Sequence, residues 1–188
     1  MNRILETERL IIRKFAADDA QRLYENHLDA EVQKWFPNES YQDVGEAREA
    51  IQFFADCVNR KELPYVLAVE SKETGKLIGD TGLNEVEGKS EEVEIGFIIC
   101  RECRGKGYAS ELVKTVSEFA FSVFGVNALY GRVMHGNAAS QRVLEKCGYT
   151  FVREEAGAED DPWGKGMLVY RKEKDALSAT NDPKEVFP

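Results

Sequence analysis

The sequence predicts an α+β fold in which a single mixed, twisted β-sheet is flanked by about four helices. The chain has 188 residues, the usual length of one domain. Its 43% hydrophobic and 31% charged residues are typical of an ordinary globular protein. Short strand-like runs alternate with segments of helical periodicity, and neither a repeat nor a linker interrupts them. We therefore expect one domain over residues 1–175 and a loose tail over 176–188, where periodicity is lost.

The first half of the chain predicts three strands and two helices. Runs rich in β-branched residues predict strands at 9–13, 65–69 and 76–83, the last two joined by a turn at Thr74 and Gly75. A capping signal at Asp18 begins a helix that continues to about residue 26. Apolar residues at helical spacing predict a second helix over 44–59. The polar stretch 38–43 between the helices is expected to be a loop.

The second half predicts a long alternating strand followed by an amphipathic helix. Over 92–100, Val93 and Ile95 belong to an apolar face, while Glu92, Glu94 and Gly96 lie on the opposite face. An apolar stripe predicts a helix over 108–124. A strand at 128–134, a short helix from residue 137 to a C-cap at residue 148, and strands at 150–153 and 167–171 complete the expected order.

The charge balance excludes two classes of partner. Lys and Arg number 25 against 34 Asp and Glu, a net charge of −9. A chain that neutralises phosphates is expected to be basic, so we predict no nucleic acid and no membrane as partners. The N-terminal residues do not resemble a secretory signal. Four cysteines do not suggest a disulfide framework, and His and Cys show no metal-ligand spacing, so we expect no metal and a reduced, cytoplasmic protein.

The most informative motif is a basic, glycine-rich turn between a strand and a helix, Arg104-Gly105-Lys106-Gly107. Glycine lets the backbone approach a ligand closely. The first N–H groups of a helix lack internal partners and form an anion site with the helix dipole. Two positive charges at a helix start oppose that dipole, which favours a bound anion over a purely structural turn. The alternative is a plain turn with solvated basic side chains.

Two other phosphate motifs do not match. Gly88-Lys89-Ser90 resembles the end of a P-loop, but Leu83 stands where that motif requires glycine. The dinucleotide pattern fails because Ser110 occupies its third glycine position.

The turn, extended to Arg104-Gly105-Lys106-Gly107-Tyr108-Ala109, resembles the R-x-x-G-x-G/A signature of the GNAT superfamily of acyl-CoA-dependent N-acyltransferases. Three further blocks resemble the branch that includes ribosomal-protein N-terminal acetyltransferases. They are Glu6-Thr7-Glu8-Arg9-Leu10-Ile11-Ile12-Arg13, Glu94-Ile95-Gly96-Phe97-Ile98-Ile99, and Asn137-Ala138-Ala139-Ser140 followed by Leu144-Glu145-Lys146-Cys147-Gly148-Tyr149. Order and spacing agree over about residues 5 to 172. The resemblance implies the GNAT fold.

The resemblance also implies acetyl-CoA as co-substrate and assigns its contacts. Backbone groups of the turn and the first helical turn would hold the diphosphate, and a strand edge and the late motif would hold the pantetheine arm. The implied residues are Phe97, Ile98, Ile99, Arg104, Gly105, Lys106, Gly107, Tyr108, Ala109, Ser110, Asn137 and Ser140.

Acetyl transfer to an amine requires a base, because a protonated amine cannot attack a thioester. Glu94 is the candidate base, acting through water, and Glu92 is the alternative. Many superfamily members carry a tyrosine acid seven residues after the late-motif asparagine, where this chain has Leu144. Ser140 is therefore the candidate acid or a coenzyme contact, or simply a capping hydroxyl. Tyr108 and Tyr149 are weaker candidates.

The acceptor is expected to be an amine-bearing small molecule, such as a polyamine, or a protein N-terminus. By resemblance, the aromatic residues Trp35, Phe36 and Tyr41 would wall its pocket, although they could instead cap the core. Glu92 belongs to an acidic cluster that would attract a cationic amine. Homodimers are common in the branch. The alternative functions are a non-catalytic acyl-CoA-binding module and a phosphate-binding domain unrelated to coenzyme A.

Overall fold

The computed structural model describes residues 3–37, 39–157 and 166–174. Its strands form one eight-stranded sheet with the order β1-β2-β3-β4-β5-β6-β8-β7. The strands are β1 (Arg3–Glu6), β2 (Leu10–Arg13), β3 (Tyr65–Ser71), β4 (Leu77–Val86), β5 (Lys89–Ile99), β6 (Ala128–Met134), β7 (Thr150–Glu155) and β8 (Met167–Glu173). Neighbouring strands are antiparallel, except that β5 and β6 are parallel. The predicted α+β class with one mixed sheet is confirmed.

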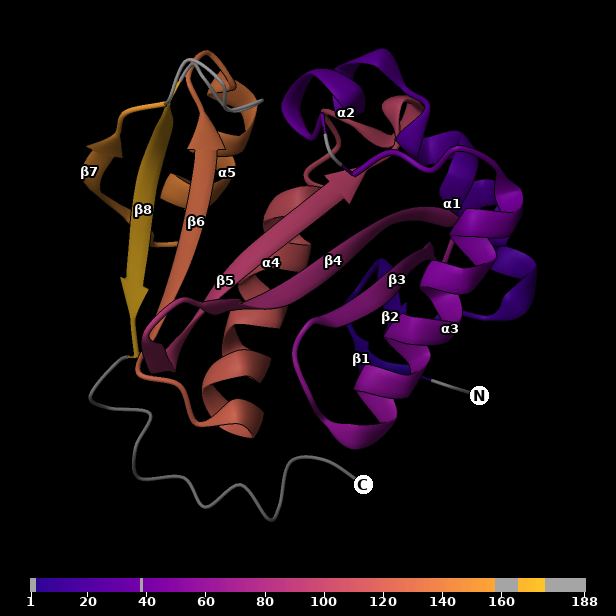
Figure 1. Ribbon diagram of the computed structural model, residues 1–188, viewed down its shortest axis with the longest axis horizontal. Helices are drawn as coiled ribbons and strands as arrows, with labels where there is room; N and C mark the ends of the chain where they lie inside the picture. The colour runs from indigo at the N-terminus through magenta and orange to yellow at the C-terminus, as the bar shows by residue number, and fades with distance from the viewer. Residues whose placement is uncertain (1–2, 38, 158–165, 175–188) are drawn as a thin grey trace.

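Helices cover both faces of this sheet. They are α1 (Ala20–His27), α2 (Ala30–Trp35), α3 (Val44–Arg60), α4 (Tyr108–Phe119) and α5 (Ala138–Lys146). In Figure 1, α1 and α3 lie together on one side of β3 and β4, while α4 lies behind β5. The short α5 packs against α4 and β6. Two helical layers thus enclose the sheet, and β5 lies between them near its centre.

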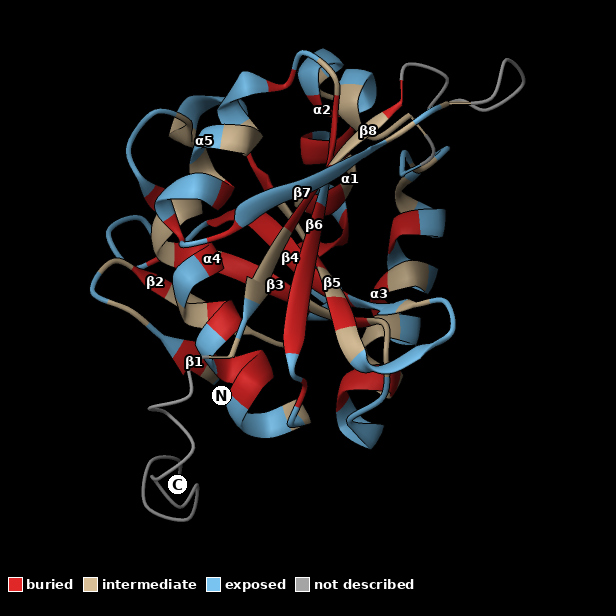
Figure 2. Ribbon diagram, turned by 90° about the vertical axis from the view of Figure 1, so that its left-hand side faces the viewer, coloured by how far each residue is buried: buried red, intermediate tan, exposed pale blue. Residues whose placement is uncertain are grey.

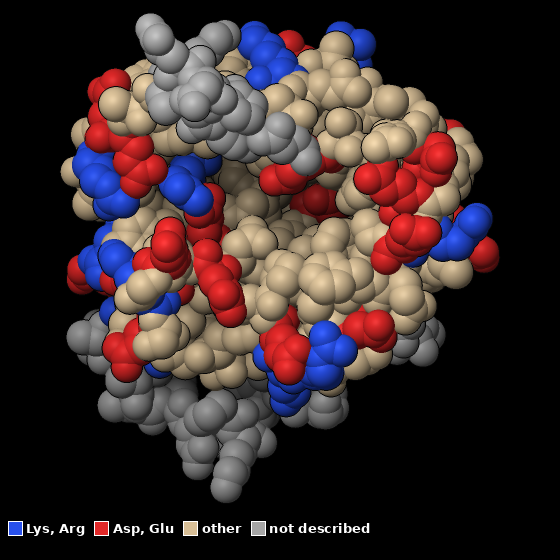
Figure 3. All heavy atoms as spheres, viewed as in Figure 1, with Lys and Arg blue, Asp and Glu red and all other residues tan. Residues whose placement is uncertain are grey.

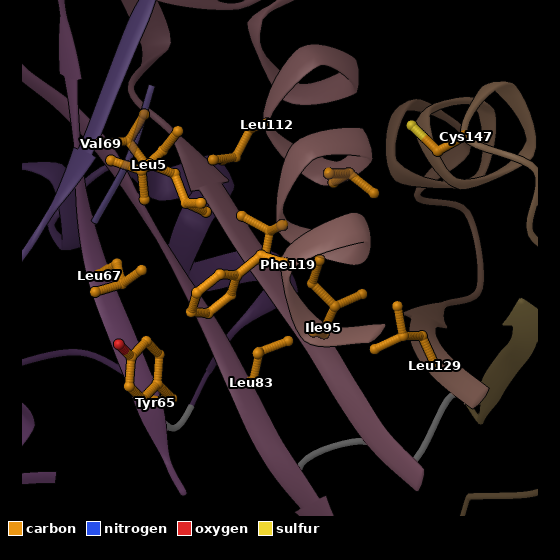
Figure 4. Packing of buried hydrophobic residues seen from close by; sticks show 14 of the residues in the cluster. Leu5, Tyr65, Leu67, Val69, Leu83, Ile95, Leu112, Phe119, Leu129 and Cys147 are labelled. Atoms are coloured by element: carbon orange, nitrogen blue, oxygen red, sulfur yellow. The ribbon is translucent and has the colours of Figure 1, made fainter. Parts of the chain in front are cut away.

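The alternation along the strands divides the core into two clusters. Val93 and Ile95 of β5 join Leu112 of α4 in the larger cluster, and all three are at most 3% exposed. Figure 4 shows Ile95 and Leu112 within this layer, and Figure 2 shows the buried residues gathered on the central strands. A smaller cluster lies beneath α1 and α3 and includes Leu23 and Ile51. Because alternate β5 side chains fill the α4 side, Glu94 must point toward the other face.

Three elements differ from the sequence expectation. β1 and α2 were not predicted, so the described part of the chain has five α-helices instead of about four. Both are too short, at four and six residues, to show a periodic pattern. Helix α4 ends at Phe119 and continues as a π-helical turn over Ala120–Phe124, whereas an unbroken helix was expected over 108–124.

The expected tail over 176–188 lies outside the described residues. Within the described ranges, none of the helices has the length and apolar character needed to cross a membrane. All four cysteines are free thiols.

Candidate active site

The central feature of the site is a wedge between β5 and β6. Their parallel pairing covers only Glu92–Glu94 and Ala128–Tyr130, while β5 continues to Ile99. Beyond Glu94 the two strands diverge, as Figure 1 shows. The N–H of Cys100 is directed toward β4, where it donates to Ile78 O. Because successive residues of a strand point their backbone groups to opposite sides, Phe97 and Ile99 direct theirs into the wedge.

The glycine-rich turn closes one end of the wedge. Gly105 and Gly107 have φ angles of 76° and 84°, in the left-handed region that favours glycine. Gly107 is the N-cap of α4 and provides no side-chain cap. Among the described residues, the N–H groups of Gly105, Lys106 and Gly107 have no hydrogen-bond acceptor. The turn therefore presents free backbone donors at a helix start, the arrangement that binds anions.

The Arg104 side chain forms contacts within the protein that compensate its charge. Its Nη2 donates to Asp29 Oδ1 at 3.0 Å, and its Nε donates to Ile99 O at 2.9 Å. Asp29 is the N-cap of α2, and although partial burial opposes it, the Arg104 guanidinium holds the pKa of Asp29 below its usual range. The side chain thus joins the turn to α2, and its charge is compensated. Of the two positive charges expected at the turn, that of Arg104 is therefore balanced by a carboxylate.

A cavity of about 350 Å³, which we call the turn cavity, lies against the turn. It is lined by the end of β5, the turn, the first turn of α4, and one face each of α2 and α5. Every residue expected to contact coenzyme A lines it except Lys106: Phe97, Ile98, Ile99, Arg104, Gly105, Gly107, Tyr108, Ala109, Ser110, Asn137 and Ser140. The structure thus brings together residues from three separate parts of the chain.

A second cavity of about 380 Å³, the strand cavity, occupies the wedge itself. Glu94, Arg132 and Glu155 supply charged groups to its lining. Figure 3 shows a hollow on this face with Asp and Glu side chains around it. Five residues line both this cavity and the turn cavity: Trp35, Phe36, Phe97, Asn137 and Ser140. The two cavities therefore adjoin at these shared side chains.

Glu94 lies in the strand cavity with its side chain 21% exposed. One carboxylate oxygen accepts from Arg132 Nε at 2.8 Å. Burial raises the pKa of Glu94, and the Arg132 guanidinium opposes that shift. A carboxylate whose pKa is raised is a stronger base, which suits it for removing a proton from an amine or from a bridging water.

Asn137 and Ser140 lie where the two cavities meet. Asn137 caps α5, since its Oδ1 accepts from the Ser140 N–H at 3.2 Å. The capping is therefore done by Asn137, and the Ser140 hydroxyl has no hydrogen-bond partner in the described part of the chain. This leaves the hydroxyl available to a ligand. Tyr149 is unsuited to proton transfer at this site, because its buried hydroxyl is paired with Ser117 Oγ at 2.8 Å.

The residues expected to line the acceptor pocket lie in different places in the structure. Trp35 and Phe36 lie at the junction of the cavities, and Trp35 is the last residue of α2. Tyr41 lines a third cavity, beneath α3, and its ring lies 5.0 Å from that of His27. Glu92 lines none of these cavities and instead pairs with Lys89 at 2.6 Å and Arg171 at 3.3 Å. The structure does not bring Glu92 to the site.

Sequence reasoning missed several residues of the cavities. Asn84 lies directly opposite Glu94 on β4, and Arg132 reaches Glu94 from β6. Buried His27 places Nδ1 2.5 Å from Glu39 O and Nε2 3.2 Å from Asp80 Oδ2. The strand register could have revealed Asn84, but nothing local signals the other contacts.

No cluster of metal-ligating side chains is found in the ranges that the structure describes.

Comparisons with known proteins identify the fold and the family. Residues 9–150 match the family model of the acetyltransferase (GNAT) domain. The uncharacterized N-acetyltransferase YoaA of Bacillus subtilis is 32% identical over 146 residues, which cover 78% of this chain and 82% of YoaA. The ribosomal-protein-S5-alanine acetyltransferase of Vibrio fischeri has a TM-score of 0.79 at 17% identity, covering 92% of this chain and 97% of that one. Spermidine N-acetyltransferase of Vibrio cholerae, solved with CoA and spermine, has a TM-score of 0.72 at 20% identity, covering 88% and 94%.

Proposed function

The chain belongs to the GNAT family of acetyltransferases, and we propose that it transfers the acetyl group of acetyl-CoA to a primary amine by direct attack. The acetyl donor is the one common to the family. The acceptor is a small amine or a protein N-terminus. The observation that carries this proposal is that the turn cavity and the strand cavity adjoin at Asn137 and Ser140, with free backbone donors in one and Glu94 in the other.

The turn cavity suits coenzyme A. The diphosphate would accept hydrogen bonds from the free N–H groups of Gly105, Lys106 and Gly107, which the positive φ angles of the glycines leave exposed. The amides of the pantetheine arm would pair with the open edge of β5 at Phe97, as an added strand. Asn137 lies beside this path. Since Arg104 is held by Asp29, this binding relies on backbone groups more than on that side chain.

The strand cavity suits the amine. Glu94, acting directly or through a water, would remove a proton from the attacking ammonium or amine. The carbonyl oxygen becomes negatively charged in the tetrahedral intermediate, and the Phe97 N–H, directed into the wedge, would stabilise it. The thiolate of coenzyme A then departs, and the free Ser140 hydroxyl would supply a proton to it. The amide product and the thiol leave the site.

The test is thiol release from acetyl-CoA in the presence of an amine panel, with mass spectrometry of the acetylated product. We expect amine-dependent release that decreases strongly in Glu94→Gln, while calorimetry shows that this variant still binds coenzyme A. Glu118→Gln, an exposed change on α4 remote from both cavities, is the matched control. Coenzyme binding without release for any amine would favour the non-catalytic module. Absence of coenzyme binding would overturn the proposal.

A further inference from the structure

A third cavity of about 600 Å³, which we call the helix cavity, lies between the sheet and the pair α1 and α3. It shares five lining residues with the strand cavity: Phe36, Glu39, Asn84, Gly96 and Phe97. A ligand whose amine reaches Glu94 would therefore have space to extend beneath α3. The two compartments form one continuous site with a polar end at Glu94 and a second end under the helix.

A glycine pair forms the floor between the two compartments. Gly82 and Gly96 lie directly opposite each other on β4 and β5, between the pairs Asn84–Glu94 and Asp80–Ile98. All of these positions belong to the same sheet face. A Cβ atom built at Gly96 would meet nothing within 4 Å, so the space above this residue is open. The sheet surface is thus lowest where a ligand would pass from one cavity to the other.

Aromatic side chains dominate the walls of the helix cavity. Phe36 and Tyr41 come from the segment after α2, and Phe53 and Phe54 come from α3. Phe53 is 51% exposed although it lines a cavity, and its described aromatic neighbour is Phe54 at 5.9 Å. Exposed aromatic surface beside a cavity is typical of a ligand-binding wall. Faces of aromatic rings also attract cations.

The charges of this cavity are acidic. Glu39, Glu46, Glu49 and Asp80 line it, and neither Lys nor Arg is found among its described lining residues. Asp80 is paired with His27, and Glu46 accepts from the Gln42 N–H at 2.5 Å. In the described part of the chain, the carboxylates of Glu39 and Glu49 have neither a hydrogen bond nor an ion pair. Both residues are exposed and line the same cavity as the aromatic rings, and their carboxylates complement a positive charge carried on an apolar group.

We propose that the acceptor is a long, bifunctional cation: a primary amine joined to a second cationic group by an uninterrupted apolar spacer. The reactive amine lies at Glu94, the spacer crosses Gly96 beside Phe36, and the second cation lies in the helix cavity near Glu39 and Glu49. The inference rests on the proposed acetyl transfer. Ile98 lies four positions after Glu94 on β5, a span of about 13 Å at the usual rise of a strand. A straight diamine of the length of diaminooctane approaches this span.

The experiment compares diaminooctane with octylamine, which lacks only the second amine. We expect kcat/KM to be higher for the diamine by about tenfold or more in the wild-type protein. The double variant Glu39→Gln/Glu49→Gln should remove most of this preference while octylamine is still acetylated. Phe53→Ala should lower kcat/KM for both long amines relative to propylamine. Glu118→Gln should change neither the preference for diaminooctane over octylamine nor the kcat/KM of the long amines relative to propylamine.

The outcomes separate the inference from the proposal on which it rests. If none of these three amines causes thiol release while another member of the amine panel does, the distal cation site is wrong and the transferase assignment stands; if the whole panel is inactive, the proposed acetyl transfer is wrong. If amines are acetylated but the diamine and octylamine are equivalent, or if the double variant keeps the full preference, the distal cation site is wrong and the transferase assignment stands. A stronger preference for spermidine than for diaminooctane would contradict the apolar spacer, because spermidine places a charge at the glycine passage.

Discussion

The ion pair between Glu94 and Arg132 allows the role of the candidate base to be tested without removing it. Arg132→Gln keeps a polar side chain beside Glu94 and removes the positive charge 2.8 Å from its carboxylate. Burial raises the pKa of Glu94, and Arg132 opposes that shift. Without Arg132 the pKa of Glu94 must therefore rise further. Because the base acts in its ionised form, the acidic limb of the pH profile of kcat/KM should move to higher pH.

The size of this shift follows from the geometry. Two unit charges about 4 Å apart interact by about 4 kcal/mol at an effective dielectric constant of about 20. The Arg132 side chain is 48% exposed, so solvent screening reduces the interaction to roughly 1–2 kcal/mol. Since one pKa unit corresponds to about 1.4 kcal/mol, we expect the acidic limb to move by about one pH unit.

The assay is thiol release at subsaturating amine across the pH range, with wild type and the variants measured in parallel. Arg153→Gln is the matched control, because Arg153 pairs with Glu155 at 2.6 Å and not with Glu94. It should move the limb much less. Glu94→Gln should remove the limb along with most of the activity. If Arg132→Gln lowers the rate but leaves the limb in place, the group that titrates is not Glu94, and the assignment of the base is refuted.

Two further variants test the turn and the wall of the site. Gly107→Val should weaken coenzyme A binding by tenfold or more in calorimetry, since the valine side chain intrudes where the backbone would meet the diphosphate. A non-glycine residue at φ 84° should also destabilise the fold by about 1–2 kcal/mol. Gly75→Val, with φ 65° in a remote turn, should cause comparable destabilisation but unchanged affinity. Burial disfavours the charged His27 ring, but its contacts with Asp80 and the Glu39 carbonyl raise its pKa above 6.5. The stability that the protonated His27 ring contributes is therefore complete below about pH 6.5 and is lost as pH rises through the raised pKa. Thermal unfolding should show that the wild-type protein becomes less stable across this pH window. In His27→Gln this pH-dependent decline should be absent.

Local patterns predicted the parts of the site that depend on local geometry. Alternation along β5 placed Glu94 on the face opposite Val93 and Ile95, and the structure agrees. The strand–glycine–helix order identified the turn at Gly105 and Gly107, and the asparagine before α5 was correctly expected to begin that helix. In each case the responsible interactions lie within a few residues of one another. Such interactions leave a readable pattern in a single sequence.

Contacts between distant residues were not predictable in this way. Asp29 neutralises Arg104 although 75 positions separate them, so counting basic residues at the turn overstated its free charge. Glu92 and Glu94 share one strand face, yet only Glu94 reaches a cavity, because Lys89 and Arg171 hold Glu92. Which carboxylate is engaged depends on side chains brought in by tertiary packing. Periodicity carries no information about them.

The net charge of −9 raises the question of how an acidic protein would bind an anionic coenzyme. An acidic protein can bind an anionic coenzyme if the donors are backbone N–H groups, whose partial charges persist whatever the side chains carry. With Arg104 held by Asp29, we propose that the turn binds the coenzyme in this way. The acidic excess is then available for the proposed second cation, because Glu39 and Glu49 line the helix cavity and have no ion pair among the described residues. In the proposed complex the main chain recognises the anion and the side chains recognise the cation, so that one short cleft would accommodate ligands of opposite sign.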